Sequence, residues 1–266
     1  MEHLLFALAL AGYLAVALSR VPGFERRPGW VEPAGRVALW GGVATHLAGL
    51  VWMSVSSDQL PVYTPGASMV LLSGTIGLVT LAVQRMPRAE ALSGLLAALV
   101  VVLLGLGLIL PNPIRATSEG IGSLWFPIHA AMIFLGLAGF ALAFGVSLLY
   151  LTVRGRLKQK RLAGLQRLPA LDSLDALNTR FIVFGFLALT VGIAAGGLWA
   201  ASLEGDAAMG PTVYATLVLW GWYAAAVGVR VVGGWRGRLA AHFSVVGFVG
   251  LLLGLGAIGV AFQGWH

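Results

Sequence analysis

Long apolar stretches separated by short polar segments make up most of the chain. An apolar stretch of about 20 residues spans a bilayer as a helix, and eight stretches are of this kind. They cover residues 4–18, 37–55, 67–83, 91–110, 124–153, 181–201, 213–229 and 239–262. The pattern predicts an all-α, polytopic membrane protein with about eight transmembrane helices. No internal repeat or second domain is evident, so residues 1–266 are expected to form a single transmembrane domain.

The basic residues predict which way these helices point. Of the 17 lysines and arginines, all except Arg115 fall in four segments, 19–36, 84–90, 154–180 and 230–238. Because short loops rich in Lys and Arg stay in the cytoplasm, these segments predict the inner side, with both termini on the outer side. Segment 154–180 is expected to be a solvated loop. The first apolar stretch lacks a basic residue before it, so we expect a retained helix rather than a signal peptide.

Composition and charge exclude several classes of protein. With 59% hydrophobic and 10% charged residues, against about 25% charged in soluble domains, the chain is not a soluble globular protein. The net charge of +7 lies in loops, which argues against a nucleic-acid partner. The absence of cysteine excludes thiol–disulfide chemistry by this chain.

Catalysis and proton transport are disfavoured on the same grounds. By the boundaries above, no Asp, Glu, Lys or Arg lies within a predicted helix. Proton-driven transporters usually need such groups at membrane depth. No nucleophile with its base and no phosphate-binding loop is evident either. The sequence alone therefore predicts that the chain is not an enzyme.

Histidines are the main ionisable side chains left near the predicted helices. His129 and His266 lie near outer ends, His46 near the middle of the second helix and His242 near the inner end of the last. A hydrogen bond to a backbone carbonyl would satisfy any single imidazole at membrane depth. Two imidazoles at matching depth also suit a haem iron, bound from opposite sides. His129 and His266 are therefore the predicted iron ligands, and His46 and His242 form a weaker second pair.

Several motifs, taken together, resemble a known family. They read HL at 46–47, WFPIHA at 125–130, LYL at 149–151, RLK at 156–158, GWRGR at 234–238 and GWH at 264–266. Over about residues 40–266 the chain resembles the cytochrome c assembly, haem-handling membrane proteins of the CcsA type. It is most similar to their short eight-helix, HemX-like relatives.

The resemblance implies that the chain binds haem near the outer membrane face and relays it for attachment to c-type cytochromes. It implies haem b as cofactor, one or two per chain, with the external haem held by His129 and His266; an inner haem would have to use another residue, for which His242 is the candidate. Its implied partners are other cytochrome c maturation membrane proteins or an apocytochrome, in the cell inner (cytoplasmic) membrane. On position alone, Trp125, Trp199 and Trp265 are expected to flank the porphyrin. Arg115 is expected either to pair with a propionate or to be an ordinary exposed residue.

Two departures from the family leave alternatives open. In segment 199–211 only Trp199 and Gly205 fit the family's tryptophan-rich signature, and Gly228 stands where the family commonly has a histidine. These departures favour a haem-binding relative, or a regulatory or scaffolding membrane protein of haem biosynthesis without obligatory haem transfer. A small-molecule transporter is a less favoured alternative.

Overall fold

The computed structural model of the chain describes residues 1–20, 28–58, 60–62, 64–86, 88–110, 124–161, 165–203 and 210–263. These residues form eight α-helices and one short 3-10 helix, with no β-strand among them. The elements are α1 (Glu2–Ser19), α2 (Val31–Ser57), α3 (Pro65–Val83), α4 (Glu90–Ile109), α5 (Trp125–Lys158), η1 (Leu165–Arg167), α6 (Leu171–Ala201), α7 (Pro211–Val231) and α8 (Arg238–Gln263). The predicted all-α fold is confirmed.

Helices α1 to α6 are long and apolar enough to cross a membrane. The apolar segment Arg238–Gly254 of α8 is shorter. The protein is therefore a multi-pass membrane protein. Membrane crossing by α7 and α8 and the orientation of the termini stay predictions.

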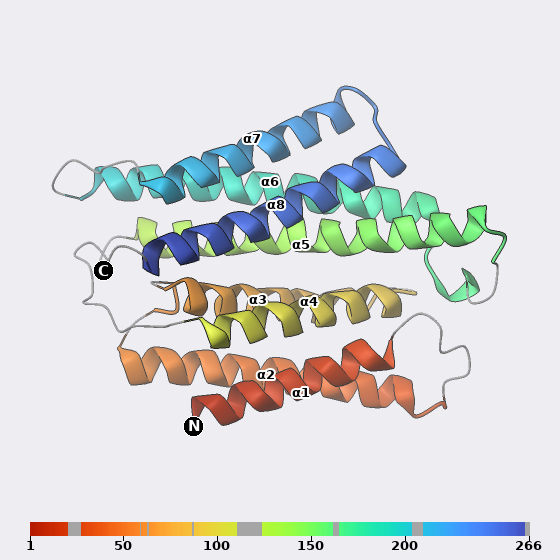
Figure 1. Ribbon diagram of the computed structural model, residues 1–266, viewed down its shortest axis with the longest axis horizontal. Helices are drawn as coiled ribbons and strands as arrows, with labels where there is room; N and C mark the ends of the chain where they lie inside the picture. The colour runs from red at the N-terminus through yellow and green to blue at the C-terminus, as the bar shows by residue number, and fades with distance from the viewer. Residues whose placement is uncertain are drawn as a thin grey trace. The chain divides into compact units, whose positions relative to one another are not determined.

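The chain divides into two compact units. Unit 1 contains Met1–Ile114 and Leu151–Ser173, and unit 2 contains Arg115–Tyr150 and Leu174–His266. Within each unit, successive helices run in opposite directions (Figure 1). The expectation of a single domain stays a prediction, and each unit is described by itself.

In unit 1, small residues bring the helices into backbone contact. A Cβ atom on Gly12 of α1 would lie 2.9 Å from the carbonyl oxygen of Ala38 and from the Cα of Gly42, both in α2. A Cβ on Gly107 of α4 would lie 2.9 Å from the carbonyl oxygen of Gly66 in α3. Glycine at these positions permits the close approach on which helix association in membranes depends.

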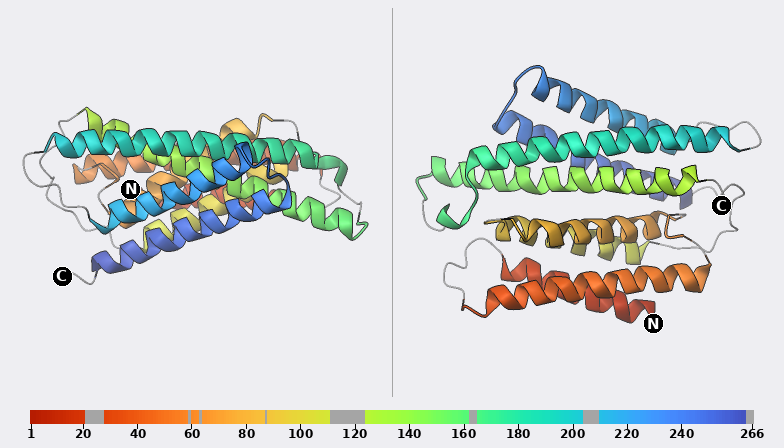
Figure 2. Two further views of the ribbon diagram at one scale, coloured as in Figure 1. Left: turned by 90° about the horizontal axis from the view of Figure 1, so that it is seen from above. Right: turned by 180° about the vertical axis from the view of Figure 1, so that it is seen from behind.

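In unit 2, α5 and α6 lie side by side (Figure 2). A Cβ on Gly139 of α5 would lie 2.8 Å from the Cα of Gly185 in α6. Aromatic rings then join α5 to the last two helices, with Phe140 stacked on Tyr223 of α7 and Phe144 stacked on Phe248 of α8. This packing fixes the α5–α6 pair that carries the candidate site.

Several helices extend beyond the apolar stretches that predicted them. Helix α2 begins at Val31 rather than 37, α5 ends at Lys158 rather than 153, and α6 begins at Leu171 rather than 181. The predicted loop 154–180 is therefore wrong at both ends. Hydropathy marks the part of a helix that lies in lipid, whereas backbone hydrogen bonds continue beyond it. The expectation that no charged residue lies within a helix is wrong for the same reason, because α6 includes Asp175 and α7 includes Arg230.

Candidate functional site

His129 lies in the second turn of α5, and its half-buried imidazole faces α6. Its Nδ1 is 2.7 Å from the backbone carbonyl oxygen of Gly192 in α6. Because a carbonyl only accepts hydrogen bonds, Nδ1 carries the proton and donates it, which leaves the lone pair on Nε2. This is the arrangement by which metal-binding histidines are usually oriented.

Residues from both helices surround this imidazole. The ring of Trp199 in α6 is stacked near it, with ring centroids 6.1 Å apart and an interplanar angle of 28°. Phe126 also packs against Trp199, with ring centroids 4.8 Å apart and an interplanar angle of 57°. A Cβ atom on Gly196 would lie 2.6 Å from Nδ1 of His129. The imidazole therefore fits against α6 only because position 196 has no side chain.

Of the other residues predicted for this site, the structure describes only some. Trp125, at the start of α5, has 40% of its surface exposed. Arg115, Trp265 and His266 lie outside the described residues. The pairing of His129 with His266 therefore stays a prediction.

His46 is fully buried in unit 1. Its Nε2 lies 3.1 Å from the carbonyl oxygen of Val70 in α3. The rings of Phe6 and Tyr13, both in α1, meet it edge-on with centroids 5.7 and 5.8 Å away. Its Nδ1 is buried with no hydrogen-bond partner among the described residues. The hydrogen bond and the two rings account for the placement of this imidazole by packing.

His242 is exposed on α8 in unit 2, where its Nδ1 donates to the carbonyl oxygen of Arg238 at 2.6 Å. It belongs to a different unit from His46, and the pairing of these two histidines stays a prediction. Within the described residues, no group of three or more His, Cys, Asp or Glu side chains is arranged to hold a metal ion.

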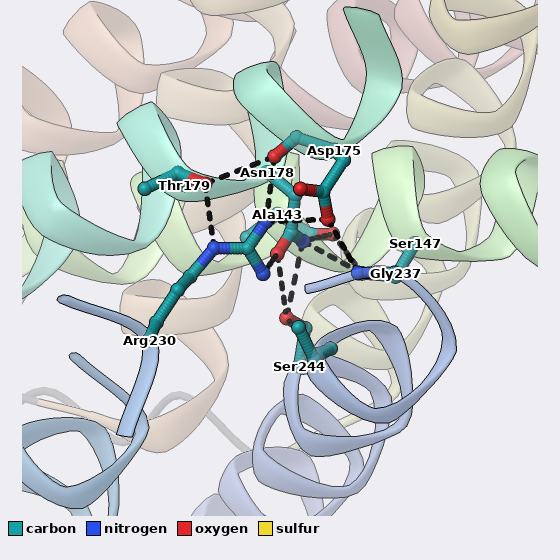
Figure 3. Close-up of polar contacts among 9 residues, drawn as sticks. Ala143, Ser147, Asp175, Asn178, Thr179, Arg230, Gly237 and Ser244 are labelled. Carbon is teal, nitrogen blue, oxygen red and sulfur yellow. Dashed lines mark hydrogen bonds and ion pairs between the residues drawn. The ribbon is translucent and has the colours of Figure 1, made fainter. Parts of the chain in front are cut away.

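A buried polar cluster in unit 2 was not predicted from the sequence (Figure 3). Arg230 of α7 forms an ion pair with Asp175 of α6, with Nη2 and Oδ1 2.7 Å apart. The same guanidinium donates to the Asn178 side-chain oxygen at 2.9 Å and to the Thr179 hydroxyl at 2.5 Å. Only 4% of the Arg230 side chain and 19% of the Asp175 side chain are exposed.

Asn178 extends this cluster to two further helices. Its amide nitrogen donates to the carbonyl oxygen of Ala143 at 2.9 Å and to the hydroxyl of Ser147 at 2.7 Å, both in α5. It also donates to the hydroxyl of Ser244 in α8 at 3.1 Å. The cluster therefore links all four helices of unit 2 (Figure 3).

The sequence did contain a signal for this cluster. Asp175, Asn178 and Thr179 are spaced three and four residues apart, which places them on one face of a helix. Extending the sixth helix back to residue 171 would have predicted a polar stripe there. Its partner, Arg230, lies 55 residues from Asp175 along the chain, and only the fold identifies it.

Comparisons with known proteins agree with the sequence resemblance. The family model described as cytochrome C assembly protein matches residues 62–266. The cytochrome c biogenesis protein CcsA of Parasynechococcus marenigrum is 37% identical over 105 residues, which cover 37% of this chain and 34% of that protein. The protein of the same name from Gloeothece citriformis is 40% identical over 86 residues, which cover 32% of this chain and 26% of that protein.

A solved structure shows the same fold. The cytochrome c haem lyase CcmF matches 98% of this chain and 48% of its own, with a TM-score of 0.70 and 18% sequence identity. The matches to the curated relatives span between a quarter and about a third of their length, and the match to CcmF about half.

The lyase name corrects one expectation drawn from the sequence. The missing nucleophile and base predicted a protein that is not an enzyme, yet a chain of this fold is named a lyase. The missing motif is therefore no ground for excluding an enzyme of this fold. Because the family model matches residues 62–266, more than half of the 266 residues, this chain belongs to the cytochrome c assembly protein family.

Proposed function

We propose that this chain acts in cytochrome c biogenesis by holding haem at His129 and presenting it for attachment to an apocytochrome. The observation that carries the proposal is the hydrogen bond from His129 Nδ1 to the Gly192 carbonyl at 2.7 Å. It fixes the tautomer and directs the Nε2 lone pair away from α6. The proposed location is the outer side of the cell inner membrane.

The surroundings of His129 support haem over a bare metal ion. A haem is a flat, largely apolar disc whose iron accepts neutral imidazole. Trp199 provides an aromatic face beside the imidazole, and Trp125 is partly exposed nearby in sequence. No cluster of three or more metal-binding side chains accompanies His129 among the described residues. We propose that His266 supplies the second ligand, that Trp265 lines the porphyrin, and that Arg115 pairs with a propionate.

This role is compatible with a lyase reaction. Covalent attachment of haem uses thiols of the acceptor cytochrome, so this chain needs no cysteine. Holding one reactant in a fixed orientation lowers the entropic part of the barrier, and the His129–Gly192 bond provides such an orientation. The contribution that we propose for this chain is to bind, orient and present haem b, one or two per chain. The proposed partners are the apocytochrome and other maturation proteins of the membrane.

Absorption spectra of the purified protein test the proposal. We expect the reduced wild type to show the split bands of low-spin haem, either as purified or after adding haem. The His129→Ala variant should lose them. The matched control is His3→Ala, because the His3 side chain is 91% exposed at the start of α1. A protein that stays colourless after haem is added, or equal spectra for His129→Ala and His3→Ala, would refute the assignment.

A further inference from the structure

The turn between α7 and α8, residues 232–237, is fixed by hydrogen bonds at both ends. The backbone N–H of Trp235 donates to the carbonyl oxygen of Val229 at 3.3 Å. The backbone N–H of Gly237 donates to Oδ1 of Asp175 at 2.9 Å (Figure 3). Gly234 and Gly237 have φ values of +64° and +71°, a conformation that other residues rarely adopt. Two hydrogen bonds and two glycines in the left-handed region therefore shape the α7–α8 turn.

Arg236 lies in this turn and Arg238 begins α8 directly after it, and no acidic side chain among the described residues balances either charge. The carboxylate of Asp175 already forms its ion pair with Arg230, at 2.7 Å. Arg236 and Arg238 are exposed, and neither forms an ion pair within the part of the chain that the structure describes. By contrast, the exposed Arg36 reaches Glu32 at 3.3 Å. The turn thus presents two guanidinium groups to an anion.

The side chains next to these arginines are those found at a membrane interface. Trp235 is 43% exposed and meets Phe243 edge-on, with ring centroids 6.1 Å apart. Val232 is 89% exposed and Leu239 is 50% exposed. Tryptophan is enriched where the headgroups meet the hydrocarbon. Exposed apolar side chains beside two arginines favour a ligand that has both a phosphate and an acyl chain.

We propose that the α7–α8 turn binds the phosphate of an anionic phospholipid through Arg236 and Arg238, with Trp235 at the level of the headgroups. The planar guanidinium groups match the geometry of a phosphate better than an ammonium group does. The polar cluster has a positioning role here, because Asp175 holds both Arg230 and the backbone of the turn. A lipid bound at this turn would fix the depth of α7 and α8 in the bilayer.

Thermal melting of the detergent-purified full chain in the presence of added lipid tests this proposal. Phosphatidylglycerol should raise the melting temperature of the wild type more than phosphatidylcholine does. In R236Q/R238Q, the phosphatidylglycerol concentration needed for half the effect should rise about tenfold or more, because this variant loses the charge-assisted hydrogen bonds to the phosphate. The matched control is R85Q/R88Q, which removes two exposed charges from the turn between α3 and α4. Its response should equal that of the wild type.

A second variant separates the guanidinium groups from charge alone. R236K/R238K keeps both charges, and with them the signal that orients the helices. It should bind phosphatidylglycerol several-fold more weakly than the wild type, because the forked hydrogen bonds are lost. Equal losses in R236Q/R238Q and R85Q/R88Q, or a wild-type response in R236K/R238K, would overturn the proposal. Inorganic phosphate that protects as well as the lipid would also overturn it, since the ligand would then be a soluble anion.

Discussion

Replacing Gly196 by alanine tests whether the orientation of His129 matters for the function. The added Cβ would lie 2.6 Å from Nδ1 and 2.8 Å from Cε1 of the imidazole. The first distance is about 0.8 Å short of the 3.4 Å at which ordinary van der Waals contact begins. The imidazole must therefore move away from α6 or rotate.

The size of this movement sets the expected loss. A displacement of about 0.8 Å along the hydrogen bond would lengthen the 2.7 Å contact with the Gly192 oxygen to roughly 3.5 Å, where the bond is lost. A lost hydrogen bond of this type costs about 1 kcal/mol, which corresponds to about a fivefold loss of affinity for haem. Disturbing the partner that orients a metal-binding histidine typically costs about tenfold or more. We therefore expect Gly196→Ala to weaken haem binding by about five- to tenfold.

A neighbouring glycine provides the matched control. Gly197 is next in the same helix, and a Cβ there would have no atom within 4 Å. Gly197→Ala changes helix propensity equally and leaves His129 untouched. The assay is a spectral titration of the two purified variants with haem, alongside the wild type. If the two variants bind haem equally well, the hydrogen bond to Gly192 does not prepare His129 for iron, and the reasoning fails.

Three further predictions concern the stability of the fold and the role of His46. Asp175→Asn leaves Arg230 buried without its counter-charge and should lower the free energy of unfolding by about 3 kcal/mol. Denaturant titration of the purified protein measures this loss. A loss below about 1 kcal/mol would indicate that the ion pair is solvated. Gly139→Ala places a Cβ 2.8 Å from the α6 backbone and should lower the free energy of unfolding by about 1–3 kcal/mol. The control is Gly250→Ala, where the added Cβ has no atom within 4 Å and should leave the free energy of unfolding unchanged in the same assay. His46→Gln should lower stability by about 1 kcal/mol through its disturbed backbone hydrogen bond and leave the haem spectrum unchanged; loss of the spectrum would instead place iron at His46.

His129 shows how far sequence reasoning reached. The position of His129 near the start of an apolar stretch, together with the surrounding motif, was enough to predict it as an iron ligand, and that role stays a prediction. Its hydrogen bond to Gly192 joins residues 63 positions apart, so the choice of ring nitrogen was not accessible from the sequence. For His46 the same reasoning left open both a packed side chain and a ligand of the weaker second pair. Only the contacts with Val70, Phe6 and Tyr13 account for its place in the fold.

By itself, the sequence determined the helical class, the membrane environment and the family. Long apolar stretches and short motifs are local features of a chain. The free energy of transfer from water to the bilayer also adds up residue by residue along each stretch. It did not determine where the helices end, because backbone hydrogen bonding continues past the apolar residues into α6. Nor did it identify the pairing of Asp175 with Arg230. A buried charge is stabilised only by a partner brought to it in space, and that partner is decided by how the helices of unit 2 pack.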